Sequence, residues 1–306
     1  MTAKVLVVMS AYNGERFIAE QIESILKQKN VEITLLIRDD GSTDGTPDII
    51  RGYAQKNRNI VFIPGNNVGF RASFFNTLVD EKNVYDYYAF SDQDDYWEPE
   101  KLDRAIKMIE RVDKENVLYT SALRVVDENL NPMYTNQYKK LRISFGSALS
   151  RQRLAGCTMV FDRSLKKLCE KFRIRQEMKD AISHDAAVYY ICLLTGGTVL
   201  FDENSHILYR RHSGTVTEHG LGFIKRVNSV TAIFHENSRQ KLEQVKLLNG
   251  IYGGDISEEN RPLVDEILQY QKGFANTLRL AMDGRIRCGL FSVDVVNLLA
   301  ILTHNY

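Results

Sequence analysis

Four short apolar runs, each followed by a helical pattern, are the feature that most limits the folds open to this 306-residue chain. The runs lie at Val5–Met9, Ile33–Ile37, Asn59–Pro64 and Tyr85–Phe90, and the spacing of apolar residues predicts helices at Arg16–Gln28, Pro47–Lys56, Ser73–Val79 and Lys101–Val112. Strands that alternate with helices at this interval indicate βαβ units, and continuous apolar runs are typical of strands buried on both faces. The sequence therefore predicts an α/β fold with a mostly parallel sheet flanked by helices.

Polar residues follow three of the predicted strands. They are the segment Ala11-Tyr12-Asn13, the segment that starts at Asp39, and the acidic segment that starts at Asp92. Ligands of open parallel sheets bind beyond the carboxyl ends of the strands, so we expect these segments to converge on one crevice. Asp39 suits hydrogen bonds from a nucleobase or ribose, whereas its neighbours in RDDGSTDGT read as an ordinary helix-initiating turn.

The acidic segment FSDQDDYWEP, residues 90–99, places three carboxylates within four residues. Alternate residues on an extended strand point the same way, so Asp92 and Asp94 can face one site and share a divalent cation. Oxygen ligands suit Mg²⁺ or Mn²⁺, which commonly also bind substrate phosphates. Two simpler interpretations stay open at this point: the acidic cluster is a solvated turn, and Asp95 caps the following helix.

Three further segments carry polar side chains that suit a site. Arg71 lies where a glycine-rich loop enters a predicted helix, and helix N-termini attract phosphate, although the loop lacks the P-loop pattern. His184 and Asp185 precede an apolar run, where an Asp is commonly a helix cap. Arg210 and His212 belong to a basic stretch that, taken alone, indicates a surface turn. Residues 153–162 are predicted to form a further strand.

The whole-chain properties exclude several classes. The net charge of +1 gives no reason to expect nucleic acid as a partner. The four cysteines include no CxxC pair, which favours inert thiols in a reduced compartment over disulfides or a zinc site. No run of about 18 apolar residues is present, and the apolar N-terminal run is too short for a signal peptide. We therefore expect a cytoplasmic location.

Taken in order, the motifs resemble a known family. The series SAYNGERFIAEQIESIL, IRDDGSTDGT, NVGFRASF, FSDQDDYW, GCTMVF, SHD and YRRHSG is similar to bacterial inverting glycosyltransferases of family 2, with the Rossmann-like GT-A fold. The similarity covers about residues 4–215 and is greatest to rhamnosyltransferase-type members that build polysaccharides. The QxxRW signature of processive members is absent, which favours addition of one or a few sugars per encounter.

The resemblance implies a role for each matching position. It implies nucleotide binding by Ala11, Tyr12, Asn13, Asp39 and Asp92, a metal held by Asp94 with Asp92 and His212, and a catalytic base at Asp185. It also implies an acceptor side formed by Gly156, Cys157 and His184, and diphosphate contacts from Arg71 and Arg210. His184 stands where many members carry Glu.

The function that this resemblance implies is inverting, Mg²⁺- or Mn²⁺-dependent sugar transfer. Rhamnose from dTDP-rhamnose is the expected donor, and a growing cell-surface or cell-wall polysaccharide or a lipid-linked glycan is the expected acceptor. UDP-hexose and UDP-N-acetylhexosamine donors are alternatives within the same fold. A sugar nucleotidyltransferase and a non-catalytic nucleotide-sugar-binding protein are the alternatives from other classes.

The sequence also predicts a division of the chain. We expect residues 1–222 to form the GT-A catalytic domain and residues 223–306 a helical C-terminal region. Residues 288–302 are largely apolar and follow Arg279, Arg285 and Arg287, as in a helix that lies on the inner face of a membrane near lipid-linked acceptors. Packing on the catalytic domain and a homodimer interface are the alternatives for this region.

Overall fold

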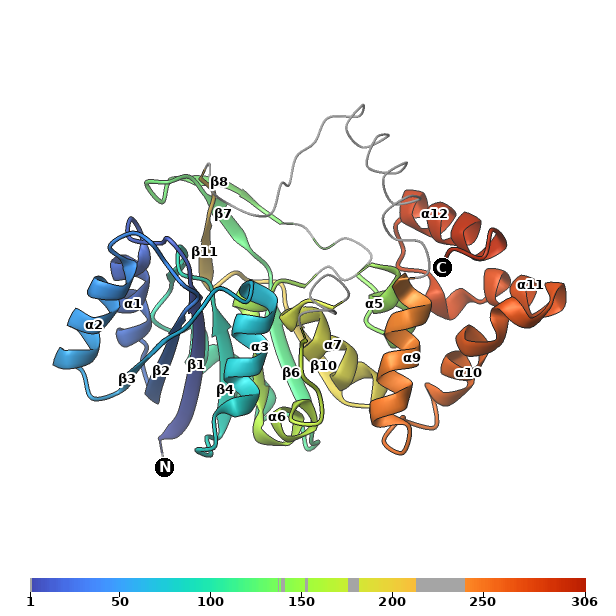
Figure 1. The fold of residues 1–306 in the computed structure, drawn as a ribbon, viewed down its shortest axis with the longest axis horizontal. Helices are drawn as coiled ribbons and strands as arrows, with labels where there is room; N and C mark the ends of the chain where they lie inside the picture. The colour runs from blue at the N-terminus through green and yellow to red at the C-terminus, as the bar shows by residue number, and fades with distance from the viewer. Residues whose placement is uncertain (1, 137, 139–140, 152–153, 176–181, 213–239) are drawn as a thin grey trace. The chain divides into compact units, whose positions relative to one another are not determined.

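The computed structural model describes residues 2–136, 138, 141–151, 154–175, 182–212 and 240–306 (Figure 1). Its backbone contacts divide the chain into two compact units. Unit 1 comprises Met1–Tyr138, Leu154–Cys192 and Gly197–His212, and unit 2 comprises Lys139–Arg153, Leu193–Gly196 and Ser213–Tyr306. The predicted domain boundary between residues 222 and 223 lies outside the described residues.

A seven-stranded sheet is the centre of unit 1 (Figure 1). Its strands are β1 (Ala3–Ala11), β2 (Val31–Asp39), β3 (Ile60–Pro64), β4 (Tyr87–Ser91), β6 (Val117–Ser121), β9 (Val160–Asp162) and β10 (Thr198–Asp202). The strand order is β10-β6-β9-β4-β1-β2-β3, and only β9 runs antiparallel to its neighbours. The mostly parallel sheet predicted from the sequence is confirmed.

Helices of unit 1 pack on this sheet. They are α1 (Ile18–Leu26), α2 (Thr46–Lys56), α3 (Phe70–Asp80), α4 (Lys101–Ile109), α6 (Arg163–Cys169) and the first turns of α7 (His184–Leu194). Alternate residues of β1 and β2, from Val5 and Ile33 onward, form one core layer with apolar side chains of α1, α2 and α4. Because strand side chains alternate, Leu6 and Val8 face the other side, where α3 contacts β1.

Unit 1 also contains a second, four-stranded sheet. It contains β5 (Tyr96–Trp97), β11 (Ile207–Arg210), β7 (Arg124–Val126) and β8 (Pro132–Thr135), in the order β5-β11-β7-β8. Because β5 follows β4 after four residues and pairs with β11, this sheet brings the end of the acidic segment to residues more than 100 positions further along the chain.

Two predicted elements differ from the structure. Helix α3 begins at Phe70 rather than at Ser73, so Arg71 lies in its first turn. The strand predicted at 153–162 is shorter: only β9 is a strand, and a 3-10 turn, η1 (Gly156–Thr158), precedes it. Gly156 is where the chain turns, and a side chain there would collide with α7.

Unit 2 is helical in its described part, as predicted for the C-terminal region. It contains α5 (Phe145–Ser150), α9 (Gln240–Tyr252), α10 (Arg261–Gln269), α11 (Phe274–Met282) and α12 (Phe291–Leu302), with 3-10 turns η3 (Tyr270–Lys272) and η4 (Gly284–Ile286). Within the described parts of the chain, none of the helices combines the length and the apolar character that crossing a bilayer requires.

Candidate active site

The carboxyl ends of β1, β2 and β4 form one edge of the large sheet. Ala11 pairs with Asp39 across β1 and β2, and Met9 pairs with Ser91 across β1 and β4. The residues that follow these pairs therefore leave the sheet at the same level. The structure thus brings together the three segments that the sequence predicted to converge.

The segment after β1 is fixed by hydrogen bonds from both of its neighbours. The Tyr12 backbone N–H donates to Oε1 of Gln93 at 2.9 Å, and Nε2 of Gln93 donates to the Tyr12 carbonyl at 3.0 Å. Asn13 has a positive φ of 48°, and its Oδ1 accepts a 2.8 Å bond from the Thr43 backbone N–H. These bonds leave the Tyr12 ring half exposed at the edge of the sheet.

The two aspartates after β2 have separate tasks. Asp39 is buried and accepts bonds from the N–H groups of Gly41 and Ser42, at 3.2 and 3.1 Å. Asp40 accepts 2.9 Å bonds from the N–H groups of Val68 and Gly69, which holds the glycine-rich loop before α3 against β2. The Ser42 hydroxyl donates a third bond, and a carboxylate accepts about four, so Asp39 retains capacity for one bond from a ligand. Its predicted nucleoside contact stays a prediction.

The acidic segment is a bend rather than a strand. Strand β4 ends at Ser91, so the expectation that Asp92 and Asp94 share one face of an extended strand is wrong in its geometry. Instead, one ligand-type atom from each of Asp92, Asp95 and Cys157 lies within 4.8 Å of the others. Cys157 reaches this cluster because β9 runs antiparallel to β4, which places η1 at the carboxyl end of β4.

The proximity of these groups changes their proton affinities. Burial, with the charges of Asp94 and Asp185 added, raises the pKa of Asp92 to about 7. Burial and the charges of Asp92 and Asp94 raise the pKa of Asp95 well above its usual range. Burial also raises the pKa of the Cys157 thiol. A cation between the carboxylates would offset their mutual repulsion, whereas the neutral thiol is a poor ligand for a hard cation.

His212 and Arg210 hold the acidic bend from the β11 side. Nε2 of His212 lies 2.8 Å from Oδ2 of Asp94. Arg210 is 3% exposed; its backbone N–H donates to Oδ1 of Asp95 at 3.1 Å and its Nε to the Asp94 carbonyl at 2.8 Å. The remaining guanidinium nitrogens donate to the Glu128 carbonyl and to the carboxylate of Glu20. This geometry favours a positioning role for Arg210, and the predicted diphosphate contact stays untested.

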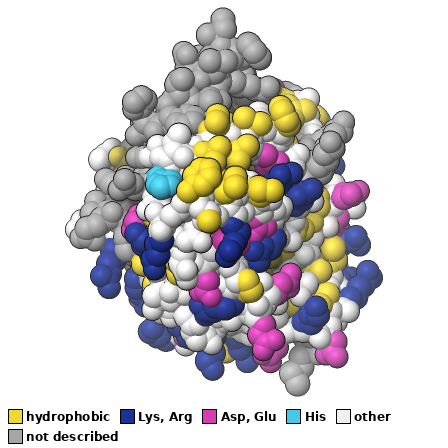
Figure 2. Space-filling model, turned by 90° about the vertical axis from the view of Figure 1, so that its right-hand side faces the viewer, with side chains coloured by type: hydrophobic (Ala, Val, Ile, Leu, Met, Phe, Trp, Pro, Cys, Tyr) yellow, Lys and Arg dark blue, Asp and Glu magenta, His cyan; other side chains and the backbone are white. Residues whose placement is uncertain are grey.

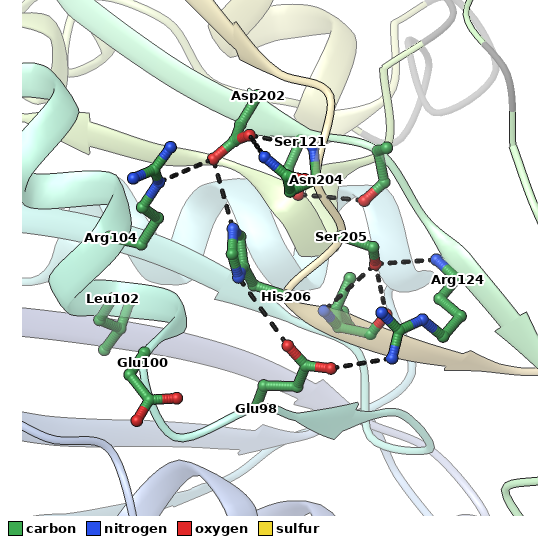
Figure 3. A network of polar contacts seen from close by, with 12 residues as sticks. Glu98, Glu100, Leu102, Arg104, Ser121, Arg124, Asp202, Asn204, Ser205 and His206 are labelled. Atoms are coloured by element: carbon green, nitrogen blue, oxygen red, sulfur yellow. Dashed lines mark hydrogen bonds and ion pairs between the residues drawn. The ribbon is translucent and has the colours of Figure 1, made fainter.

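A polar network anchors the start of β11 (Figure 3). Nε2 of His206 lies 3.3 Å from Oδ2 of Asp202, and its Nδ1 lies 3.8 Å from Oε2 of Glu98. Arg104 donates to Asp202 at 3.1 Å, and Arg124 donates to Glu98 at 3.1 Å, as Figure 3 shows. The network ties α4, β7, β10 and the loop before β11 together, so it fixes the strand that carries Arg210.

A buried cation lies beneath the bend. Lys101 is 1% exposed, and its Nζ lies 3.6 Å from the centroid of the Trp97 ring. Burial lowers the pKa of Lys101 to about 7, while the nearby Cys157 and Asp95 oppose that shift. Among the described residues, neither Nζ of Lys101 nor Oδ2 of Asp95 has a hydrogen-bond partner. Trp97 is therefore the packing surface for this cation.

The N-terminus of α7 supplies the last part of the site. Oδ1 of Asp185 accepts a 2.8 Å bond from the Ala186 N–H and a bond from the Ser183 hydroxyl, so Asp185 also stabilises the start of the helix. His184 is buried and stacks on Phe74, with ring centroids 4.3 Å apart. A Cβ on Gly156 would lie only 2.7 Å from Nε2 of His184, so η1 and α7 approach each other closely.

Burial lowers the pKa of His184; the charge of Asp185 opposes this shift, and the charge of Arg71 adds to it. The guanidinium of Arg71 lies 5.4 Å from the Phe70 ring centroid, near the start of α3. Arg71 therefore contributes positive charge on the His184 side of the site. Its predicted diphosphate contact stays a prediction.

Sequence reasoning missed three side chains that organise the site. They are Gln93, which joins the bend to β1, Glu20, which bonds Arg210 from α1, and Lys101 beneath the bend. Gln93 stands between the two aspartates of the D-x-D pattern. Only the pairing of β5 with β11 reveals the other two, and no local pattern encodes that pairing.

Solved structures define the fold class. A crystal structure of Staphylococcus aureus TarS in complex with UDP-GlcNAc superimposes with a TM-score of 0.62 at 17% identity, over 99% of this chain and 88% of that one. A mannosyltransferase from Pyrobaculum calidifontis in complex with GDP-Man and Mn²⁺ gives a TM-score of 0.54 at 16% identity, over 100% and 87% of the two chains. The fold is thus the GT-A fold of nucleotide-sugar glycosyltransferases.

The chain belongs to glycosyltransferase family 2, whose model matches residues 6–169. A relative named dTDP-rhamnosyl transferase RfbG, from Shigella flexneri, is 27% identical over 90% of this chain and 92% of its own. The putative glycosyltransferase EpsE of Bacillus subtilis is 36% identical over 41% of this chain and 45% of its own. The protein is therefore a glycosyltransferase, as predicted.

Proposed function

We propose that the protein transfers one sugar from a nucleotide-sugar to a saccharide acceptor with inversion at the anomeric carbon. The observation that carries this proposal is the gathering of Asp92, Asp94 and Asp185 at the carboxyl edge of the sheet, close enough for the charges of the last two to raise the pKa of Asp92. Such a cluster suits a cation with a diphosphate on one side and a base on the other.

Rhamnose from dTDP-rhamnose is the proposed donor. It rests on the similarity to the Shigella dTDP-rhamnosyl transferase, which aligns with this chain over nearly the full length of both. The structural neighbours carry UDP-GlcNAc and GDP-Man, so nucleotide-sugars with other bases and sugars suit the same fold. UDP-hexoses and UDP-N-acetylhexosamines are accordingly the alternatives.

The residues present fit a divalent cation. Asp92 and Asp94 supply carboxylate oxygens, and His212 contacts Asp94, so these three would hold Mg²⁺ or Mn²⁺. When bound, the cation would neutralise charge on the diphosphate leaving group. Asp95 accepts the hydrogen bond of the Arg210 backbone N–H, which suits a supporting role.

Asp185 is the proposed general base. Its carboxylate would accept the proton of the acceptor hydroxyl while that oxygen bonds to the anomeric carbon. The bond from the anomeric carbon to the nucleoside diphosphate breaks on the opposite face, and the diphosphate keeps the bonding pair, which inverts the configuration. The hydrogen bonds to Asp185 from Ser183 and Ala186 hold its carboxylate in one orientation.

The acceptor is proposed to be a cell-surface saccharide or a lipid-linked glycan, approached from the side of Gly156, Cys157 and His184. With it we propose a cytoplasmic location at the inner face of the membrane. We also propose that residues 1–222 act as the catalytic domain and that 223–306 serve association, with a membrane or with a second copy.

Calorimetry with a donor panel tests the proposal. The panel contains dTDP-rhamnose, UDP-glucose, UDP-galactose and UDP-N-acetylglucosamine, each with and without Mn²⁺ or Mg²⁺. We expect metal-dependent binding of one donor, followed by turnover only when a saccharide acceptor is added. Release or formation of diphosphate without an acceptor would instead identify a nucleotidyltransferase, and binding without turnover on any acceptor a binding protein.

A further inference from the structure

Two helices of unit 2 expose an apolar surface. Among the described residues, half of the exposed large hydrophobic side chains lie on α11 and α12: Phe274, Leu278, Met282, Phe291, Val295, Leu298, Leu299 and Leu302. The most exposed are Phe291 at 85%, Phe274 at 79% and Met282 at 70%. Figure 2 shows hydrophobic side chains gathered beside Lys and Arg on the face turned to the viewer. We call these eight side chains the α11–α12 face.

The spacing of these residues places them together. Phe274, Leu278 and Met282 recur every four residues, which is one face of α11, while Leu280 and Ala281 point inward. The exposed residues of α12 follow the same helical spacing from Phe291, and Asn297 and Ile301 are its buried residues. The two helices contact each other. Exposed apolar surfaces of this kind mark interaction sites.

On α11, α12 and the turns around them, basic side chains outnumber acidic ones, while the adjoining α10 adds Arg261, Asp265 and Glu266. Residues 270–306 include four Lys and Arg side chains against two carboxylates. Both carboxylates have local tasks: Asp283 pairs with Arg285, and Asp294 accepts a 2.8 Å bond from the Cys288 N–H. Lys272, Arg279 and Arg287 are exposed. The face therefore combines apolar side chains with a basic border.

We infer that the α11–α12 face binds the surface of an anionic lipid bilayer. A basic border suits anionic headgroups, because Lys and Arg close to such a surface are attracted by its negative potential. The 12 residues of α12 extend about 18 Å, which is too short for a hydrocarbon core of about 30 Å, so the helix would lie in the interface.

A symmetric dimer through this face is less favourable. A two-fold interface places the same surface of two copies together, so the basic borders formed by Lys272, Arg279 and Arg287 would face each other. Membrane binding would keep the enzyme near a lipid-linked acceptor, and only this purpose rests on the proposed function. The surface chemistry itself does not depend on the donor.

Vesicle sedimentation with the full chain tests this inference. We expect the wild type to partition onto vesicles of equal phosphatidylcholine and phosphatidylglycerol, and more weakly onto phosphatidylcholine alone or at high salt. The double variant Met282→Gln, Phe291→Ser should partition at least about tenfold more weakly, since two exposed apolar side chains no longer insert. Val84→Ser, which removes a 62% exposed side chain in unit 1, is the matched control and should not change partitioning.

Charge reversal tests the basic border separately. Arg279→Glu with Arg287→Glu should reduce partitioning onto the anionic vesicles by at least about tenfold. Arg58→Glu, at an exposed position in unit 1, is the control. Partitioning of either double variant equal to that of the wild type would overturn the inference. A wild-type dimer that becomes monomeric in Met282→Gln, Phe291→Ser and binds no vesicles would overturn it in favour of self-association.

Donor binding without vesicles separates the two proposals. If the Met282→Gln, Phe291→Ser variant loses vesicle binding but keeps the donor affinity of the wild type, the face acts independently of the active site. If the wild type binds vesicles but binds no nucleotide-sugar, with either metal or without one, the surface inference is supported and the proposed function is contradicted.

Discussion

Nε2 of His212 lies 2.8 Å from Oδ2 of Asp94, although the two residues are 118 positions apart in the chain. His212 directly follows Arg211 after β11, and Asp94 lies in the bend between β4 and β5. The pairing of β5 with β11 sets their separation. The contact therefore ties the proposed metal-binding bend to the last residue of unit 1.

Replacement of His212 tests this contact. We expect His212→Ala to weaken Mn²⁺-dependent donor binding by about 10- to 100-fold, because groups that orient metal ligands typically contribute that much to metal affinity. Titration of Mn²⁺ at fixed donor, followed by calorimetry, measures the change. His304→Ala is the control, since that imidazole contacts the Thr277 hydroxyl in unit 2. An unchanged Mn²⁺ midpoint in His212→Ala would remove His212 from the metal site.

Asp185→Asn tests the proposed base. The amide keeps the size of the side chain but cannot take up a proton, so turnover should fall by about 10²- to 10⁴-fold. Donor affinity should stay within about twofold of the wild type, because the base acts on the acceptor hydroxyl. Stopped assays for turnover and calorimetry for donor binding measure the two quantities. Loss of donor affinity with little loss of turnover would place Asp185 among the metal or nucleotide ligands instead.

The sequence predicted the sheet because its central strands are encoded locally. Val5–Met9 and Ile33–Ile37 are continuous apolar runs, and both lie inside the longer strands β1 and β2. The short strands β5 and β9 carry no such signal, since two or three residues cannot show a period. They form because neighbouring strands supply hydrogen-bond partners, which is a property of the tertiary structure.

The same distinction applies to the site. Convergence of the segments after β1, β2 and β4 follows from the parallel order of the strands, so a strand-end rule predicts it. The strand-end rule does not predict the bend at Asp92–Asp95, because Arg210 and Cys157 contact it from distant segments of the chain. A local argument assigned the basic stretch at 210–212 to a surface turn, yet Arg210 is buried.

Arg210 and Arg16 allow a matched comparison. Both guanidinium groups lie over the Phe17 ring, at 4.5 and 4.8 Å from its centroid, and both bond Glu128. The two differ in burial, because the Arg210 side chain is 3% exposed and that of Arg16 is 61% exposed. Arg210→Met should lower the free energy of unfolding by about 2 to 4 kcal/mol, since it removes the three hydrogen bonds that the buried guanidinium donates to Glu20, Glu128 and the Asp94 carbonyl. Arg16→Met should cost less than about 1 kcal/mol. Urea titration measures both, and equal losses would contradict the positioning role of Arg210.

Gly156→Ala tests how closely η1 must approach α7. The added Cβ would lie 2.7 Å from Nε2 of His184 and 3.1 Å from Cβ of Asp185, so the start of α7 must shift. We expect turnover to fall by about tenfold to 100-fold, because displacement of a catalytic group by about 1 Å costs up to that much. Donor affinity should change little.

Gly52→Ala is the matched control for that change. Gly52 lies in α2, and a Cβ there meets nothing within 4 Å. Replacement should leave turnover unchanged and raise the free energy of unfolding by about 0.5 to 1 kcal/mol, as for a glycine in a helix interior. Steady-state kinetics of both variants make the comparison, and equal turnover in Gly156→Ala and the wild type would show that η1 does not position the base.

Lys241 should make the stability of unit 2 depend on pH. It lies on α9, and its Nζ donates to the Ser150 carbonyl and to Oδ1 of Asn297, 4.8 Å from the Tyr306 ring centroid. Burial lowers the pKa of Lys241 from 10.5 to about 7, although Cys288 and Asp294 oppose the shift. Between these two values the unfolded chain binds the proton that the folded chain lacks.

The free energy of unfolding should therefore rise with pH through that window. Below about pH 7 both states carry the proton, so Lys241 should add no pH dependence there. The gain is at most about 1.4 kcal/mol per pH unit. Urea titrations from neutral to alkaline pH on the wild type and on Lys241→Met isolate the effect, since the variant lacks the titrating group. Lys246→Met, on the same helix with a side chain 50% exposed, is the control. Parallel pH profiles for the wild type and Lys241→Met would show that the Lys241 ammonium stays protonated in the folded protein.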